Sequence, residues 1–533
     1  MPFPAHPHAP TRRTLLRLVG ASAVLPFLPT GARAQDTSPP DPVEAGQPFS
    51  FDLLSEAMAR RAQAPDPGPR TAPLALPDLD YDGIRHIAFN PKRALWRDEQ
   101  GQRFQVQAFH RGWLFADPVA LYDISSGIAD PITFTAADFD YRGPLKGTID
   151  PSTPLNGVAG WRLTTPLNGL ETFDELVAFL GASYFRALGE GNFYGASARG
   201  LALDTATERK EEFPRFSAFY FERPTPGTET IRVFAALDSA RVTGAYRFII
   251  TPGNPTAMEV TARLFFRTAV AELGVAPLTS MFLYDETTPG RFNDYRPQVH
   301  DSQGLAIHDT TGHRIWRSLA NPTRLGGSWY HMDRPPIFGL YQRDRAFAAY
   351  QDAGARYDKR PSIEVEPLGD WGPGHVRLVE IPADLEKYDN IVAYWRPDDA
   401  PRAGDSREYA YRLTWGNMTG ADSKLGHVAH TSSGQAGVAG IAPKDSKGRK
   451  FVIDFGGGHL AQIDPATDLI PQVRVDNGQA TAISLSAIEG TGLWRLSFDV
   501  VAQGGTKTTE LSAWLEGFDR ILTETWSYQW IPA

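Results

Sequence analysis

The chain has 533 residues, a formal net charge of -9 and 11% aromatic residues, and it contains no cysteine. The absence of cysteine excludes disulfides, thiolate metal sites and a cysteine nucleophile. The negative charge and the lack of a lysine-rich or arginine-rich tract argue against a nucleic-acid surface. The aromatic content favours either carbohydrate binding, in which rings stack on the apolar faces of sugars, or a large β-sheet core.

The first 34 residues are typical of an export signal. Arg12 and Arg13 precede a modest apolar run, residues 15–28, and the small-x-small sequence Ala-Arg-Ala ends at residue 34. This pattern predicts a twin-arginine signal peptide over residues 1–34, with cleavage before Gln35. The apolar run is too short and too interrupted to predict a membrane span. We therefore expect an exported bacterial protein.

Helical signals are scarce in the rest of the chain. Residues 35–47 are rich in proline and polar side chains and predict a flexible leader. Phe49–Ala62 has apolar residues at helical spacing and no helix breaker, which predicts an amphipathic helix. Thr172–Leu180 begins with Thr172 and Glu175 at the spacing of a capping box, which predicts a second helix.

Short β-branched and aromatic runs, separated by Gly, Pro, Asn and Asp, predict strands along most of the chain. They are Ile231–Leu237, Ala245–Thr251, Ala257–Thr268, Glu380–Trp395, Tyr409–Trp415, Lys450–Phe455, Thr481–Ile488, Leu493–Val500 and Thr508–Leu515. The polar segment 398–406 predicts a linker. We therefore expect an all-β fold with a large β-domain over residues 48–397 and a smaller β-sandwich over residues 407–533.

One stretch, NDYRPQVHDSQGLAIHDTTGHRIWR at residues 293–317, combines charged, imidazole and indole side chains with almost no apolar periodicity. Asp301 lies at its centre, so we expect a carboxylate at a turn or strand end that solvent can reach. The alternative interpretation is a polar surface loop, since most charged residues are exposed.

Several short patterns are typical of cofactor or metal chemistry but lack the required context. His300, His308 and His313 lie near one another, yet loop spacing does not impose a convergent geometry and HExxH is absent, so no metal site is predicted. The triplet Asp-Phe-Gly at 454–456 has no accompanying kinase motifs, and the pattern at 195–199 lacks the final glycine of a nucleophile elbow. No cofactor is predicted.

Several long motifs resemble, in order, those of the periplasmic glucan biosynthesis proteins G and D. They are SYFRALGEGNFYGASARGLALDT (183–205), EEFPRFSAFYFERP (211–224), LGVAPLTSMFLY (273–284), NDYRPQVHDSQGLAIH (293–308), RYDKRPSIEVEPLGDWGPGHVRLVEIP (356–382), YDNIVAYW (388–395) and ETWSYQ (524–529). The likeness extends from Phe49 to the C-terminus, and several ordered motifs are far more specific than one short pattern. The twin-arginine signal favours the D-type member.

The resemblance implies a fold and a pathway. The fold is a large galactose-mutarotase-like β-sandwich followed by an immunoglobulin-like β-sandwich. The pathway is the biosynthesis of osmoregulated periplasmic glucans, whose backbone is β-1,2-linked glucose. Members act in the periplasm as anomer-inverting β-1,2-glucanases or related transglycosylases. The resemblance implies a β-1,2-linked glucan substrate and contact with the glucan synthesis machinery at the inner membrane.

The resemblance assigns the general acid to Asp389, in YDNIVAYW, and the general base to Asp301, in VHDSQGL. A carboxyl pair with separated pKa values can protonate the leaving oxygen and deprotonate water. The apolar residues after Asp389 predict a desolvated carboxyl with a raised pKa, which suits an acid. The polar, partly cationic neighbours of Asp301 predict an ionised carboxylate, which suits a base.

Aromatic and guanidinium side chains near these motifs are candidate sugar contacts, because rings stack on sugars and guanidinium groups bind hydroxyls. They are Trp316, Arg317, Tyr357, Arg360 and Trp371. Burial in the core is the alternative for the two tryptophans, and a structural ion pair is the alternative for Arg360. A non-catalytic glucan-binding scaffold is the alternative to an enzyme, and the sequence leaves hydrolysis and transglycosylation open.

Overall fold

The computed structural model describes residues 42–76, 79–288, 290–421, 423–437, 448–504 and 508–532. The predicted signal peptide and the first part of the predicted leader lie outside these residues. Residues 42–47, the rest of that leader, are attached to the fold, because Val43 is buried and the Gly46 N–H donates to the Ala129 carbonyl at 2.8 Å. The prediction of a flexible leader is therefore wrong for residues 42–47.

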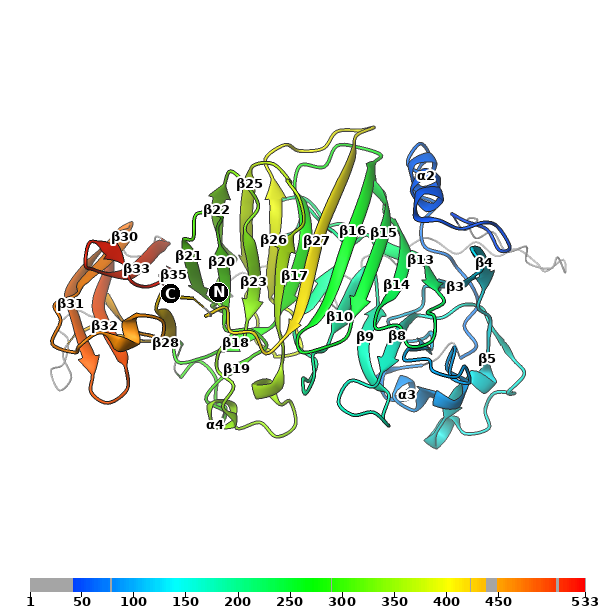
Figure 1. Cartoon of the computed structure of the whole chain (residues 1–533), viewed down its shortest axis with the longest axis horizontal. Coiled ribbons are helices and arrows are strands. Elements are labelled where there is room, and N and C mark those ends of the chain that lie inside the picture. The colour runs from blue at the N-terminus through cyan, green and yellow to red at the C-terminus, as the bar shows by residue number, and fades with distance from the viewer. Residues whose placement is uncertain are drawn as a thin grey trace, which may run out of the picture. The chain divides into compact units, whose positions relative to one another are not determined.

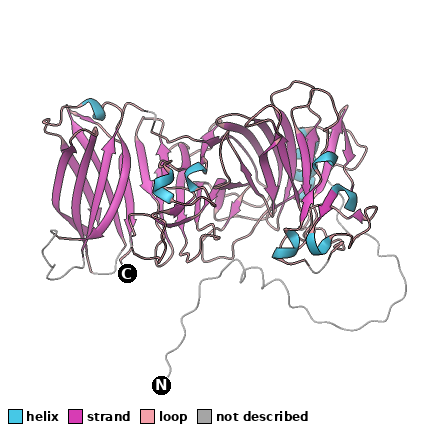
Figure 2. Cartoon of the chain, turned by 90° about the horizontal axis from the view of Figure 1, so that it is seen from below, coloured by secondary structure: helices cyan, strands magenta, loops and turns pink. Residues whose placement is uncertain are grey.

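Strands dominate the described structure, and the helices are few and short (Figure 2). This confirms the predicted all-β class. The first predicted helix is α2 (Phe51–Arg61), where Ser50 caps the N-terminus by accepting a hydrogen bond from the Leu53 N–H at 3.1 Å. The other α-helices in the part of the chain that the structure describes are α3 (Tyr81–Ile84) and α4 (Phe347–Tyr350). Within the described residues, no helix is long and apolar enough to cross a membrane.

The second predicted helix is wrong. Asp174–Leu180 is strand β9, which pairs with strands on both sides. Leu176, Val177 and Phe179 are buried in the core between two sheets, and this packing outweighs the local capping signal.

Two long sheets form the framework (Figure 1). The first has ten strands, in the spatial order β2 (Gln105–Phe109), β8 (Gly160–Thr165), β9, β10 (Tyr184–Ala187), β11 (Ser197–Arg199), β17 (Leu273–Ser280), β26 (Ile391–Pro397), β25 (Gly374–Glu380) and β22 (Gly326–Met332), with β12 (Ala202–Leu203) beside β17.

The second sheet has fifteen strands. Its order is β30 (Ile470–Asp476), β33 (Thr509–Gly517), β35 (Thr525–Trp530), β21 (Arg314–Ser318), β20 (Gly304–His308), β23 (Ile337–Tyr341), β24 (Ser362–Pro367), β27 (Ser406–Gly416), β16 (Thr256–Phe266), β15 (Val242–Thr251), β14 (Ile231–Asp238), β13 (Arg215–Glu222), β3 (Ala120–Ser125) and β4 (Ile128–Pro131), with β34 (Arg520–Ile521) beside β33.

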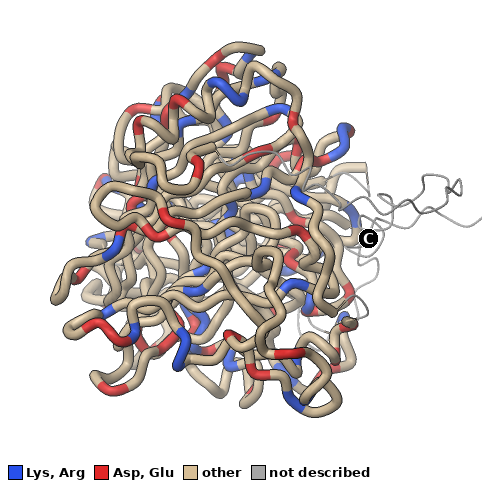
Figure 3. The backbone as a smooth tube through the Cα atoms, turned by 90° about the vertical axis from the view of Figure 1, so that its right-hand side faces the viewer, with Lys and Arg blue, Asp and Glu red and all other residues tan. Residues whose placement is uncertain are grey.

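Shorter sheets complete the fold. Four strands, β28 (His427–Gln435), β29 (Gly448–Gly456), β32 (Leu493–Ala502) and β31 (Gly478–Ile488), form one sheet. Three strand pairs are β1 (Ile87–Phe89) with β6 (Phe139–Tyr141), β5 (Phe134–Thr135) with β7 (Pro154–Leu155), and β18 (Phe282–Tyr284) with β19 (Val299–His300). In the view of Figure 3, acidic and basic residues are interspersed along the described chain.

The main core lies between the two long sheets. Trp161 and Trp395 of the ten-stranded sheet share one apolar cluster with Phe248 and Trp415 of the fifteen-stranded sheet, and all four are fully buried. Alternating residues of each strand enter this core, as the period of a strand requires.

A second core joins the four-stranded sheet to the other end of the fifteen-stranded sheet. Phe451 and Phe498 pack there against Trp526 of β35. Strand β35 pairs in parallel with β21, with Ile315 opposite Thr525. One sheet therefore runs through both sandwiches.

The predicted domain boundary needs correction. Residues 398–405 of the predicted linker form the loop between β26 and β27, and β27 pairs with both β16 and β24. Tyr411, Leu413 and Trp415 of β27 belong to the main core. The chain therefore leaves the large sandwich after Gly416, because the alternation of β27 buries its aromatic face in that core.

Candidate active site

The ten-stranded sheet has one face on the core and one polar face. In β10, Phe185 enters the core, so Tyr184 and Arg186 lie on the opposite face. In β11, Ala198 enters the core and Arg199 lies opposite Tyr184, with its guanidinium 4.7 Å from the Tyr184 ring centroid. The polar face thus carries guanidinium and phenol groups near the middle of the sheet.

Asp301 lies in the short link between β19 and β20, where its backbone N–H donates to the Met281 carbonyl at 2.8 Å. Its carboxylate forms an ion pair with the Arg360 guanidinium, and the residue is only 5% exposed. Burial, with a smaller contribution from the charge of Asp389, raises the pKa of Asp301 to about 6 against the opposing effect of Arg360. Asp301 and Asp389 are therefore close enough to interact electrostatically.

Arg360 and Tyr357 form the wall beside Asp301. Tyr357 begins the 3-10 turn Tyr357–Lys359, and the Arg360 guanidinium lies 4.2 Å from the centroid of its ring. The Tyr357 hydroxyl donates to Glu386 at 2.9 Å, and Arg296 donates to the same carboxylate at 2.8 Å. Tyr357 is buried, and this burial raises the pKa of its hydroxyl. Packing and hydrogen bonds thus fix Tyr357 and Arg360 beside Asp301.

Asp389 lies in the loop that precedes β26, and it is exposed. Its neighbour Asn390 is buried and bonds through its side-chain amide to the backbone of Phe282. Burial by itself lowers the pKa of Arg199. Its interactions with Tyr184, Glu211 and Asp389 raise that pKa by more, so it lies above its ordinary value. Asp389 therefore faces a guanidinium as well as a second carboxyl.

The predicted electrostatic environments of the two carboxyls are the reverse of those observed. Asp389 is exposed because the apolar run begins at Ile391, inside the strand, and the carboxyl stays in the loop. Asp301 is buried because its polar neighbours in the sequence are buried with it and do not bring water to the carboxyl. His300, for example, is itself buried between Gln298 and Gln342.

The structure brings four predicted residues together, namely Asp301, Asp389, Tyr357 and Arg360. It does not bring the other three to the site.

Trp316, Arg317 and Trp371 are corrections to the predicted sugar contacts. Trp316 is buried in the second core, with the Arg343 guanidinium 3.6 Å from its ring centroid. Arg317 is 0% exposed and bonds to Glu380 at 2.8 Å. Trp371 is buried edge-on against Tyr409 in the main core. None of the three presents a surface that a sugar can reach.

Sequence reasoning missed Tyr184, Arg186, Arg199 and Asn390. The first three stand at alternate positions of short strands in SYFRA and ASARG, with apolar residues between them. That alternation is the signal of a half-buried strand and could have placed them on one polar face. Asn390 carried no such signal, because its role depends on a segment more than 100 positions away.

The described residues contain no group of three or more His, Cys, Asp or Glu side chains that could hold a metal ion. His300 is fully buried, and burial lowers its pKa to about 3, so its ring is neutral at physiological pH. Its two ring nitrogens lie 2.7 and 2.9 Å from the side-chain oxygens of Gln298 and Gln342, and the neutral ring donates to one of them. His300 therefore supports the loop that carries Asp301.

The site combines one buried and one exposed carboxyl with guanidinium and phenol groups. Carboxyls in unlike environments can divide the acid and base roles of a reaction. Guanidinium and phenol groups bind hydroxyl-rich ligands through hydrogen bonds and ring contacts. The arrangement therefore suits acid–base chemistry on a polyhydroxyl substrate.

Comparison with known proteins gives matches along nearly the whole chain. A family model described as "Periplasmic glucan biosynthesis protein, MdoG" matches residues 49–530. Glucans biosynthesis protein G of Cereibacter sphaeroides is 49% identical over 544 residues, covering 100% of both chains. Glucans biosynthesis protein D 1 of Ralstonia nicotianae is 42% identical over 542 residues, covering 98% of each chain. Glucans biosynthesis protein D of Stenotrophomonas maltophilia is 40% identical over 489 residues, covering 91% of this chain and 90% of the relative.

The chain therefore belongs to the periplasmic glucan biosynthesis protein family, as its ordered motifs predicted. Its family role is in the biosynthesis of periplasmic glucans. Relatives named G and relatives named D both match over nearly the full length, so the D-type assignment stays a prediction.

Proposed function

We propose that this protein acts on the β-1,2-linked glucose backbone of periplasmic glucans as an anomer-inverting glucanase or a related transglycosylase. Asp301 is the general base and Asp389 is the general acid. The observation that carries the proposal is the pairing of a buried carboxyl, held by Arg360, with an exposed carboxyl that interacts with it. Inverting glycosidases usually place two carboxyls on either side of the glycosidic bond that they hydrolyse, one as the acid and one as the base.

The base role of Asp301 is supported by its raised pKa. With a pKa of about 6, the carboxyl is ionised above that pH and is a stronger base than an ordinary aspartate. A base is most effective when its pKa lies near the operating pH. Arg360 would then hold the carboxylate toward the water or sugar hydroxyl that it deprotonates, and the buried Tyr357 ring would keep Arg360 in place.

The acid role of Asp389 depends on the substrate. The free carboxyl is exposed, and a glucan chain that lies across it would remove it from water. Burial favours the protonated form of a carboxyl, which the acid role requires. The bound substrate thus supplies the desolvation of Asp389 that the surrounding residues do not supply.

We further propose that the protein works in the periplasm after twin-arginine export, as a D-type member, and that it contacts the glucan synthesis machinery at the inner membrane. Transglycosylation requires a sugar hydroxyl to take the place of water at Asp301. The competing function is a scaffold that binds the nascent glucan without cleaving it, and the enzyme is favoured because aspartates occupy both catalytic positions.

The test is incubation of residues 35–533 with linear β-1,2-glucan, beside Asp301→Asn and Asp389→Asn variants. Products are separated by size and their anomers are followed by NMR. Shorter chains with inverted anomers from the wild type alone establish the hydrolase, and cyclic or relinked products establish the transglycosylase. Binding without any product under all conditions would establish the scaffold and refute the enzyme.

A further inference from the structure

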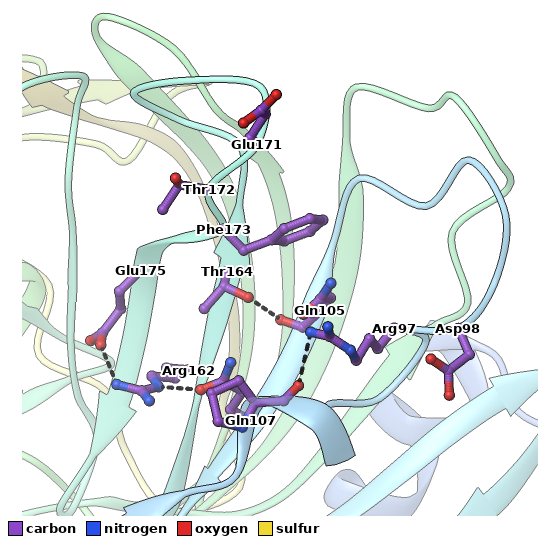
Figure 4. Close-up of a pocket in the computed structure, with 11 residues that line it drawn as sticks. Arg97, Asp98, Gln105, Gln107, Arg162, Thr164, Glu171, Thr172, Phe173 and Glu175 are labelled. Carbon is purple, nitrogen blue, oxygen red and sulfur yellow. Dashed lines mark hydrogen bonds and ion pairs between the residues drawn. The ribbon is translucent and has the colours of Figure 1, made fainter.

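A polar pocket of about 650 Å³ lies on β2, β8 and β9, at one edge of the ten-stranded sheet (Figure 4). It is separate from the residues that surround Asp301. The residues that matter for its chemistry are Gln105, Gln107, Arg162, Thr164, Phe173 and Glu175.

The floor of the pocket is made by strand alternation. Val106 and Ala108 of β2 enter the main core, and so do Trp161 and Leu163 of β8. The polar residues between them therefore lie on the opposite face of the sheet. The strand register pairs Gln105 with Thr164 and Gln107 with Arg162.

Most of these polar groups are held in place by one another. Arg162 donates to Gln107 at 2.9 Å and to Glu175 at 2.9 Å. Thr164 donates to the backbone carbonyl of Gln105 at 3.4 Å. The positions of the donors and acceptors are thus fixed before any ligand arrives, which lowers the entropic cost of binding.

Gln105 lines the pocket and is only 5% exposed. Its polar group there is the side-chain amide. It offers both donors and an acceptor, which is what a sugar hydroxyl needs.

The charges around the pocket favour a neutral ligand. Arg97 and Arg162 line it together with Asp98, Glu171 and Glu175, and Arg162 is already paired with Glu175. Neither sign dominates, so an anion or a cation gains little from the site. The half-buried ring of Phe173 adds an apolar wall, and this combination suits the apolar face and hydroxyl rim of a sugar.

A chain of contacts leads from the pocket to the proposed active site. Glu175 accepts a hydrogen bond from the Tyr194 hydroxyl, and the Arg186 guanidinium lies 5.0 Å from the centroid of the Tyr194 ring. Arg186 in turn acts on the charge of Asp301. Four strand-to-strand steps separate β2 from β11, or roughly 19 Å at about 4.8 Å each.

We infer that this pocket is a remote sugar-binding subsite, which holds glucose units of the same β-1,2-glucan several residues away from the bond at Asp301 and Asp389. The inference rests on the proposed function. Only a chain that spans the polar face can occupy the pocket and the carboxyl pair together. The subsite therefore selects long chains over short ones.

The test is calorimetric titration of linear β-1,2-glucans of increasing length into the Asp301→Asn protein, which stops turnover, with and without Gln105→Leu. We expect Gln105→Leu to weaken binding about tenfold for long chains, the worth of one or two hydrogen bonds, and to leave short chains unchanged. Phe173→Ala, at the wall of the pocket, is expected to act in the same direction. Gln479→Leu, at an exposed strand position of the four-stranded sheet, is the matched control.

The outcomes separate the two proposals. Circular dichroism establishes that each variant is folded. If folded Asp301→Asn binds long chains and neither Gln105→Leu nor Phe173→Ala weakens that binding, the subsite is refuted and the proposed function stands. If folded Asp301→Asn binds no β-1,2-glucan of any length, the proposed function fails, and the subsite fails with it.

Discussion

The side-chain amide of Asn390 pairs with both backbone groups of Phe282, accepting from its N–H at 2.8 Å and donating to its carbonyl at 2.9 Å. Phe282 follows Met281, whose carbonyl accepts from the Asp301 N–H. Asn390 thus connects the loop that ends in Asp389 to the segment that holds Asp301. The two proposed catalytic carboxyls are positioned by one short chain of hydrogen bonds.

Replacement of Asn390 by Ala should separate catalysis from binding. It leaves the Phe282 N–H and carbonyl without their partner, which costs about 1–3 kcal/mol of stability. A displacement of Asp389 should lower kcat by about 100-fold, while the KM for glucan changes little. Steady-state kinetics on the folded variant check this, and an unchanged kcat would show that Asn390 does not position Asp389.

The pH dependence of activity should follow Asp301. As the base, it must be ionised, so kcat/KM should fall about tenfold per pH unit below its pKa of about 6. Arg360 lowers that pKa, so Arg360→Met should move the acid limb of the profile to higher pH. Arg209→Met, at an exposed position, is the control. An acid limb that stays in place in Arg360→Met would contradict the assignment of Asp301.

The stability of the Asp301→Asn variant should depend on pH in a definite direction. Folding raises the pKa of Asp301 from 3.8 to about 6, so the folded protein holds the proton more tightly than the unfolded chain. This contribution to stability is present below about pH 4 and is lost as the pH rises through 6. At about 1.4 kcal/mol per pKa unit, the variant should gain about 3 kcal/mol relative to the wild type between pH 3.5 and 8.

Urea unfolding monitored by tryptophan fluorescence at several pH values measures this difference. A difference that is constant with pH would show that the pKa of Asp301 is not raised.

Arg317 should matter for stability and not for sugar binding. Its guanidinium is fully buried against Glu380, which also accepts from the Ala320 N–H at 2.7 Å. Arg317→Met leaves a buried carboxylate without its counter-charge, at a cost of about 3–5 kcal/mol. The affinity of the folded variant for β-1,2-glucan should equal that of the wild type, and a weaker affinity measured by calorimetry would restore Arg317 to the sugar contacts.

The two sandwiches should unfold together. Arg343 pairs with Glu524 at 2.6 and 3.0 Å, and the Glu524 carboxylate also accepts from the Val428 N–H at 2.7 Å. These bonds and the parallel pairing of β21 with β35 join both cores through one sheet. Calorimetry should therefore show a single transition, and Glu524→Ala should lower its midpoint. Two separate transitions in the wild type would contradict the shared sheet.

The sequence alone determined the all-β class, helix α2 and the family, because these depend on local periodicity, capping and ordered motifs. The same motifs proposed Asp301 and Asp389, whose catalytic roles stay predictions. Most strand positions were also predictable, since alternation is a property of neighbouring residues. β9 was not, because an amphipathic segment with a capping signal fits either a helix or a strand until its partners are known.

Only the tertiary structure decided burial, and burial decided the site. Trp316, Arg317, Tyr357 and Arg360 look alike as candidates in the sequence. In the structure Trp316 and Arg317 are buried elsewhere, Arg360 pairs with Asp301, and Tyr357 is buried beneath the Arg360 guanidinium. Burial also decided the domain boundary, because the aromatic face of β27 is buried in the core of the large sandwich. The free energy of burying a charge or a ring depends on the segments that surround it, and these are far away in the chain.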